Sequence, residues 1–210
     1  MIFSMLEKFR KPTRIASFVA LFLLIGGCYL PGSFDAEIEL SRTGHYKMKF
    51  DGYIVEVTMY DDLRKKKLSE DEIKAKIKQV IGDFKRDKGT REVSYFGQGA
   101  FKVRWVKNGD VIKSKMITFF RRNENMLSIT YLKKKATITL RGKYITKQNR
   151  ERLIQMGLDV KGVIKIKTDA KVISHNATKV TKDGPITIYG WKLNSINDPS
   201  PKLVVSMGLL

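Results

Sequence analysis

The chain has 210 residues, and its 41 Lys and Arg residues outnumber its 21 Asp and Glu residues, which gives a net charge of +20. An apolar content of 42% is enough for a hydrophobic core and excludes a disordered basic tail. The single cysteine excludes an internal disulfide framework and a cysteine-based metal site.

The first 27 residues have the pattern of a secretory signal. Basic residues precede an apolar run over residues 15–25, and two glycines and Cys28 follow it. This run is about half the roughly 20 residues that a membrane-spanning helix needs. The segment Ile25-Gly26-Gly27-Cys28 resembles the lipobox of bacterial lipoproteins, which implies cleavage before Cys28 and attachment of lipid to its thiol. The alternative is an uncleaved signal anchor that ends in a buried free thiol.

A lipidated Cys28 with two or three acyl chains predicts stable membrane binding. Residues 28–34 are then a short lipidated tether, and residues 35–206 form a single α+β domain. Tyr29, and not an aspartate, follows the cysteine. Among lipoproteins of Gram-negative bacteria this favours the outer membrane, and in other hosts the anchor would lie on the outer face of the cytoplasmic membrane.

Alternating apolar and polar residues predict two strands over residues 35–60, with a break at 42–44. A polar run at 61–67 separates them from a helix. Ser69 and Glu72 have the spacing of a capping box, and apolar residues at helical spacing follow as far as Phe84.

Residues 91–141 predict an antiparallel meander with turns at 97–99, 108–110 and 122–125. The pair Asn108-Gly109 is a strong hairpin signal. A short helix is expected from Thr146 to Gly157. The remaining strands are expected over residues 160–168, 170–175, 185–192 and 202–206. The fold class is therefore α+β, with a mostly antiparallel sheet, one long central helix and one shorter helix.

The late chain resembles the LppM domain family of bacterial lipoproteins. The resemblance lies in a strand from Gly162 to Thr168, the Ser174-His175-Asn176 turn, and a strand that reaches Trp191 and Leu193. It implies a compact α+β domain that handles envelope lipid or glycolipid, and it implies no catalytic residues. The sequence departs from many relatives, in which a transmembrane helix and a cytoplasmic tail follow this domain.

Basic residues recur at period two, which places each pair on one face of a strand. If these strands share a sheet, the outer face is cationic and repels itself, so that an anionic ligand would relieve the repulsion. The alternative is a solvated face that protects the sheet. The candidate residues are Lys47, Lys49, Lys102, Arg104, Lys113, Lys115, Lys165 and Lys167.

No catalytic or metal constellation is found in the sequence. His45 and His175 have no second ligand at metal spacing, and Ser174 is a strand neighbour of His175, so their side chains point to opposite faces. We therefore expect no enzymatic activity, no cofactor and no metal.

The leading hypothesis is a membrane-anchored envelope lipoprotein that binds anionic lipid, glycolipid or an envelope partner through the basic face. The alternative is a structural or assembly subunit of a secretion or pilus complex. A hydrolase of envelope polymers and a DNA-capture protein are less favoured.

Overall fold

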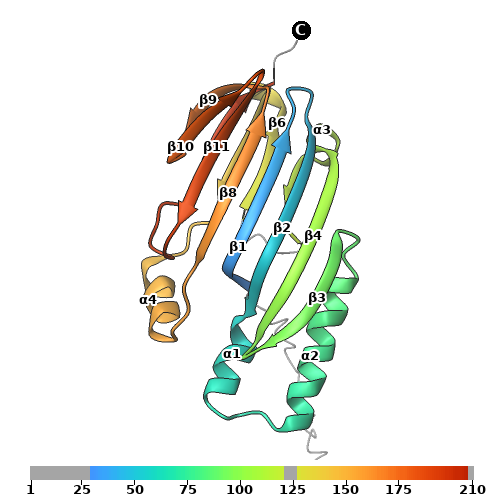
Figure 1. The fold of residues 1–210 in the computed structure, drawn as a ribbon, viewed down its shortest axis with the longest axis vertical. Coiled ribbons are helices and arrows are strands. Elements are labelled where there is room, and N and C mark those ends of the chain that lie inside the picture. Colours follow the sequence, from blue (N-terminus) through green and yellow to red (C-terminus); the bar gives the residue numbers. More distant parts are fainter. Residues whose placement is uncertain (1–28, 121–126, 208–210) are drawn as a thin grey trace, which may run out of the picture.

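The computed structural model describes residues 29–120 and 127–207, and in these residues two β-sheets face each other, with most of the helices at the lower end (Figure 1). The strands are β1 (Tyr29–Leu40), β2 (His45–Glu56), β3 (Thr90–Gly97), β4 (Ala100–Asp110), β5 (Met116–Thr118), β6 (Leu127–Leu132), β7 (Thr137–Gly142), β8 (Lys161–Thr168), β9 (Lys171–His175), β10 (Lys179–Asp183), β11 (Ile186–Leu193) and β12 (Lys202–Ser206). The helices are α1 (Val57–Arg64), α2 (Glu70–Lys85), α3 (Val111–Ser114), α4 (Lys147–Gln155) and the short 3-10 helix η1 (Lys133–Lys135). The leader, Cys28 and the turn expected at 122–125 lie outside the described residues.

One sheet has seven strands in the order β10-β11-β8-β1-β2-β4-β3, and the other has five in the order β5-β6-β7-β12-β9. Strand β1 lies in the middle of the larger sheet, antiparallel to β2 and parallel to β8. The remaining strand pairs are antiparallel. The α+β class with a mostly antiparallel arrangement is therefore confirmed.

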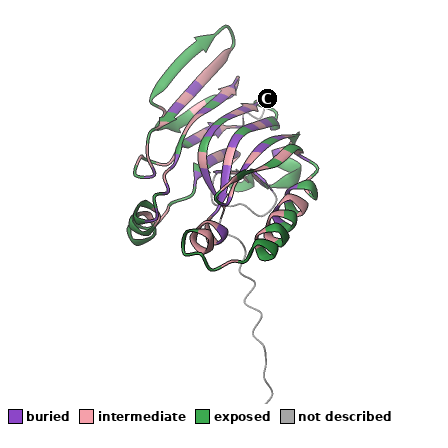
Figure 2. Ribbon diagram, turned by 60° about the horizontal axis from the view of Figure 1, so that its bottom comes forward, coloured by how far each residue is buried: buried purple, intermediate pink, exposed green. Residues whose placement is uncertain are grey.

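Alternation along the strands builds the core between the sheets. On β2 the even-numbered side chains Met48 and Phe50 are buried, and on β4 Val103 and Trp105 are buried beside them. Ile129, Leu140 and Val205 are among the side chains that the five-stranded sheet contributes. These side chains belong to one continuous cluster that extends from Leu30 to Met207. Figure 2 shows the buried residues along the strands, while the helices are mostly exposed.

Capping by side chains fixes two of the helices as expected. Ser69 and Glu72 form both hydrogen bonds of the capping box at the start of α2, and the Thr146 hydroxyl accepts from the backbone N–H of Asn149 at the start of α4. The phenol of Tyr60 in α1 donates to the carbonyl of Met156 at 3.0 Å, which ties the end of α4 to α1.

The chain has no loose tether after residue 28. Residues 29–34, expected as a tether, belong to β1, where Tyr29 pairs with Glu56 and Leu30 pairs with Val55. Leu30 and Phe34 are buried because their side chains reach the core. The folded sandwich therefore begins one residue after Cys28.

Two local predictions are wrong for identifiable reasons. Residues 57–60 do not continue β2 but start α1, because the carboxylate of Glu56 accepts from the backbone N–H groups of Thr58 and Met59. Asn108 and Gly109 do not form a hairpin but stay in β4, where Gly109 lies against the ring of Tyr46 without room for a Cβ atom.

The described residues contain four α-helices and not two. The 16-residue α2 is the longest and α4 has nine residues, whereas α1 and α3 were not expected. Strand β10 was also missed, because its five residues are exposed and mostly polar, and so show no alternation.

Candidate functional site

The outer face of the larger sheet carries charges of both signs and is not a uniform cationic surface. Six of the eight candidate basic residues lie on it, on strands β2, β4 and β8. They are Lys47, Lys49, Lys102, Arg104, Lys165 and Lys167. Strand β1 runs between β2 and β8 and places Asp35, Glu37 and Glu39 on the same face. These acidic residues also recur at period two, and the sequence interpretation overlooked them.

Ion pairs neutralise much of the predicted basic face. Lys49 lies 3.0 Å from a carboxylate oxygen of Glu37, and Lys167 lies 3.1 Å from the other oxygen. Lys102 pairs with Asp51, and Arg104 lies 3.5 Å from Glu92. Repulsion between like charges, which was the argument for an anionic ligand here, is therefore largely relieved within the sheet.

Glu37 is the most constrained of these carboxylates. Burial alone would raise its pKa, but the hydrogen bonds and charges of Lys49 and Lys167 outweigh burial and hold the pKa of Glu37 below its usual value of 4.5. The folded state therefore gains stability from the ionised form of Glu37 above pH 4.5, and loses it as the pH falls through the lowered pKa.

We expect Glu37→Gln to lower the thermal unfolding midpoint at neutral pH and to change it much less under acid conditions, where Glu37 is protonated in the wild type too. Circular dichroism melts across this pH range measure the effect. Glu92→Gln is the matched control, because Glu92 is on the same face but about half-exposed. A gap between wild type and Glu37→Gln that is equally large at neutral and acid pH would contradict the assignment.

Lys113 and Lys115 do not belong to this face. Lys113 lies in helix α3, and Lys115 follows it with a positive φ of 62°, so the expected strand with period two is wrong at this point. Lys47 and Lys167 both border an open cleft of about 760 Å³, with Glu39 also in its wall. The structure thus gathers two of the candidate lysines, together with a carboxylate.

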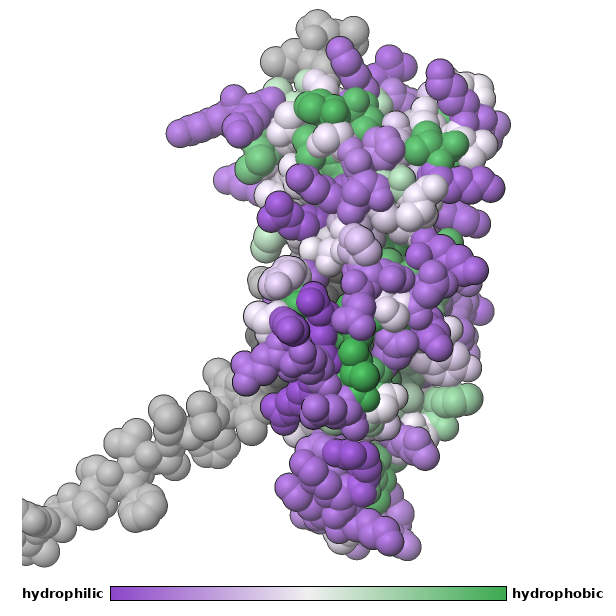
Figure 3. Space-filling model, turned by 90° about the vertical axis from the view of Figure 1, so that its left-hand side faces the viewer, coloured by the Kyte–Doolittle hydropathy of each residue, from purple (hydrophilic) through white to green (hydrophobic). Residues whose placement is uncertain are grey.

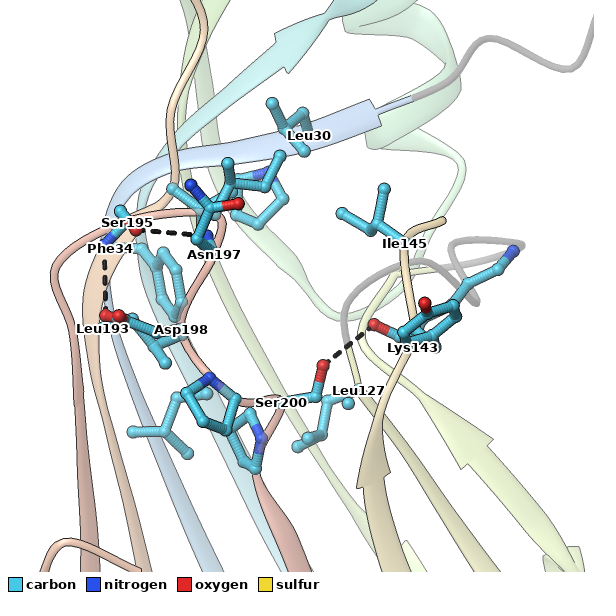
Figure 4. A pocket seen from close by; sticks show the side chains of 18 of the residues that line it. Leu30, Phe34, Leu127, Lys143, Ile145, Leu193, Ser195, Asn197, Asp198 and Ser200 are labelled. Carbon is cyan, nitrogen blue, oxygen red and sulfur yellow. Dashed lines mark hydrogen bonds between the residues drawn. The ribbon is translucent and has the colours of Figure 1, made fainter. Parts of the chain in front are cut away.

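A second, smaller and more enclosed pocket of about 180 Å³ lies between the sheets at the end where the chain enters the fold. Phe34 and Ile164 line it from the larger sheet, and Leu127 lines it from the smaller one. Leu30 from the first residues of β1 and Ile145 from the β7–α4 connection complete its apolar wall. Figure 4 labels Leu30, Phe34, Leu127 and Ile145 around one open space. We call this cavity the inter-sheet pocket.

Hydrogen bonds hold the polar rim of the inter-sheet pocket in place. A carboxylate oxygen of Asp198 accepts from the backbone N–H groups of Asn194 and Ser195 at 2.6 and 3.1 Å. The hydroxyl of Ser200 donates to the carbonyl of Lys143 at 3.2 Å, and this links the late loop to the β7–α4 connection. The rim is therefore formed before any ligand arrives.

Arg150 supplies a positive charge to the wall of the inter-sheet pocket. Its guanidinium donates to the carbonyl of Ile145 at 3.1 Å and lies 5.7 Å from the ring of Tyr144. Its Nε is buried and has no hydrogen-bond partner among the described residues. A buried donor without a partner costs about 1–3 kcal/mol, and burial keeps this Nε out of reach of a molecule in the pocket.

Basic and aromatic side chains are exposed beside this pocket, on α4 and the connection that leads to it. The exposed fraction is 70% for Tyr144 and 46% for Ile154. The basic residues Lys143, Lys147 and Arg152 are also exposed, with Lys147 on the same side of α4 as Ile154 and Arg152 on the opposite side. We call these five residues the α4 patch. A mixture of cations and exposed apolar groups is typical of surfaces that lie at a membrane interface.

Sequence interpretation missed both features. The α4 patch had a signal, because basic residues are dense from Arg141 to Arg152 and Tyr144 lies among them. The inter-sheet pocket had none, since its walls come from β1, β6, β8, β11 and the loops around α4, which only the fold brings together.

No protein-family model matches the chain, and no curated protein matches it. Among solved structures, the folded domain of LppM from Mycobacterium tuberculosis matches with a TM-score of 0.39 and 13% identity, over 84% of this chain and 92% of that one. An M1 zinc metallopeptidase from Deinococcus radiodurans matches with a TM-score of 0.33 and 8% identity, over 84% of this chain and 42% of that one. Neither likeness assigns a family.

Two features are absent from the described residues, namely a membrane-spanning helix and a metal-binding group. Within residues 29–120 and 127–207, no helix is long and apolar enough to cross a bilayer. The same part of the chain holds no group of three or more His, Cys, Asp or Glu residues placed to bind a metal ion.

Proposed function

We propose that this chain is a non-enzymatic envelope lipoprotein that is anchored through Cys28 and rests its α4 patch on an anionic membrane surface. The lipobox-like segment supports the anchor, and the location at the cell envelope follows from it. This proposal replaces the basic sheet face with the α4 patch, because the sheet face carries its own carboxylates.

One observation carries the proposal: the chain enters the fold beside the α4 patch. Leu30 and Pro31, which follow Cys28 by two and three residues, line the same pocket as Tyr144 and Arg150. A residue spans at most about 3.6 Å, so lipid on Cys28 would hold this end of the sandwich against the headgroups. Basic residues close to an anionic leaflet each contribute about 1 kcal/mol of attraction.

Two measurements test the proposal. Intact-mass analysis of protein from the native host should find an amino-terminal Cys28 that carries acyl chains. A fragment of residues 29–207, which contains every described element and the whole core, should sediment with phosphatidylglycerol-containing vesicles and release at high salt. An unmodified thiol behind an intact leader would refute the anchor. Equal binding to pure phosphatidylcholine vesicles would refute the electrostatic contact.

A subunit of an envelope assembly is the second candidate, and the exposed edge strand β10 favours it. All five residues of β10 are exposed, and its only strand partner among the described residues is β11. Ile173 on β9 and Val180 on β10 are about half-exposed, and Figure 3 shows hydrophobic side chains gathered at the upper end of this face. A partner protein cross-linked to β10 in the native envelope, without a lipid preference of the fragment, would favour this role.

A further inference from the structure

We infer that the inter-sheet pocket binds an acyl chain and holds the polar end of that chain at Arg150. The inference rests on the proposed function in one respect, namely that the pocket lies at the membrane-facing end. It names a ligand class that the surface contact of the α4 patch does not require.

The chemistry of the lining selects the ligand class. Phe34, Leu127 and Ile164 give the pocket an apolar floor between the sheets, and Leu30 and Ile145 extend this surface toward the rim. Apolar walls of this kind favour the uptake of apolar groups from water. A volume of 180 Å³ holds roughly six groups the size of a water molecule, which each occupy about 30 Å³ in the liquid. The pocket therefore fits part of one unbranched chain and is too small for a whole lipid.

The charge of Arg150 defines how the acyl chain would lie in the pocket. Arg150 brings a positive charge to the wall of the pocket. A carboxylate or phosphate group at the end of the acyl chain would be attracted to this charge. The methylene groups would then extend from Arg150 toward Phe34 and Leu127, between the two sheets.

Two sources can supply such a chain. Leu30 lies two residues after Cys28, within a reach of about 7 Å, so an acyl chain attached to Cys28 can enter the pocket. A lipid of the bilayer beneath the α4 patch can also insert one chain. The two sources share the chemistry and are distinguished by the mass of the adduct.

Photolabelling with diazirine-bearing palmitic acid tests the inference. The probe is added to the 29–207 fragment, which lacks the lipidated Cys28, and labelled residues are mapped by peptide mass spectrometry after irradiation. We expect labels on Phe34, Leu127 or Ile164, and competition by unlabelled palmitic acid. Labels confined to exposed residues such as Tyr144 and Ile154 would overturn the inference. Because no membrane is present, this result is independent of vesicle binding.

Substitutions sharpen the readout. Leu193→Trp adds bulk at the half-buried rim and is expected to reduce labelling of Phe34 at least fivefold, whereas Ile173→Trp on exposed β9 should not change it. Arg150→Gln should also reduce labelling, whereas Arg152→Gln on the same helix should not. Ala36→Met fills the pocket from β1 and provides a second test if Leu193→Trp does not fold. Unchanged labelling in the folded variants would contradict the inference.

To identify where the bound acyl chain comes from, cells are fed the same probe and are then irradiated. A pocket peptide joined to the peptide that begins at Cys28 identifies the protein's own anchor. A pocket peptide joined to a phospholipid identifies a bilayer lipid. Either adduct supports the pocket, and label found only outside it counts against it.

Discussion

Replacing Lys147 and Arg152 together by glutamine is expected to weaken binding of the 29–207 fragment to anionic vesicles by roughly 30-fold, since each basic residue near an anionic surface contributes about 1 kcal/mol. Both side chains are exposed, and Lys147 makes only a 3.8 Å pair with Glu151 one helical turn later. Exposed pairs of this kind contribute little to stability, so the fold should be unaffected. Vesicle co-sedimentation at low salt measures the change.

The matched control removes the same charge from the opposite end of the sandwich. Lys133 and Lys134 lie in η1 between β6 and β7, and Ala136 just after them pairs with Met207 near the carboxyl end of the described chain. Lys133→Gln combined with Lys134→Gln should reduce vesicle binding only slightly. If both double variants lost binding equally, the net charge of the fragment and not the α4 patch would be responsible.

Phe50→Ala is expected to destabilise the fold by about 3–5 kcal/mol, which is the usual cost of deleting a buried aromatic ring. Phe50 is 2% exposed, and its ring lies 5.5 Å from that of Phe34 and 5.0 Å from that of Phe120. These contacts link β1 and β2 to the chain that follows β5, so the cavity would open at the centre of the core. The thermal midpoint should fall by roughly 10 °C for a domain of this size.

Phe96→Ala is the control for Phe50→Ala. Phe96 is 68% exposed, and it packs only on the ring of Tyr53 at the outer face of the sheet. Its removal should change the thermal midpoint by a few degrees at most, because exposed substitutions have small effects. A loss in Phe96→Ala as large as that in Phe50→Ala would mean that the core is not where the burial pattern places it.

Strands that are buried on one face could be predicted from the sequence, because their alternation reflects a physical constraint along the strand. Tyr46, Met48 and Phe50 on β2 are buried as expected, and so are the side chains that alternate with Lys102 and Arg104 on β4. The two tryptophans, Trp105 and Trp191, are also buried, as expected for core residues.

Local signals failed where long-range contacts decided the structure. Asn108 and Gly109 favour a hairpin, but pairing with Lys47 and Tyr46 extends β4 through them. The chain turns at α3 instead, where the carboxylate of Asp110 accepts from the backbone N–H groups of Ile112 and Lys113. In the same way, the charge of the outer face depends on β1, which lies between β2 and β8 and places acidic residues among their lysines.

The candidate site was predicted least well, for a related reason. Periodicity placed six basic residues on one sheet face, but it could not show that Glu37 would lie between Lys49 and Lys167. The inter-sheet pocket depends on Leu30 and Arg150 meeting across the fold, and no local pattern encodes that distance.

The central position of β1 has a consequence for folding during the export that we propose. Residues 33–40 of β1 pair in parallel with residues far along the chain, from Ser33 with Lys161 to Leu40 with Thr168. Closing so long a loop is slow, and it requires that β8 has already crossed the membrane. One edge of the first strand therefore stays unpaired until most of the chain has been translocated. Until β8 is available, β1 can pair only with β2, so the larger sheet cannot be completed.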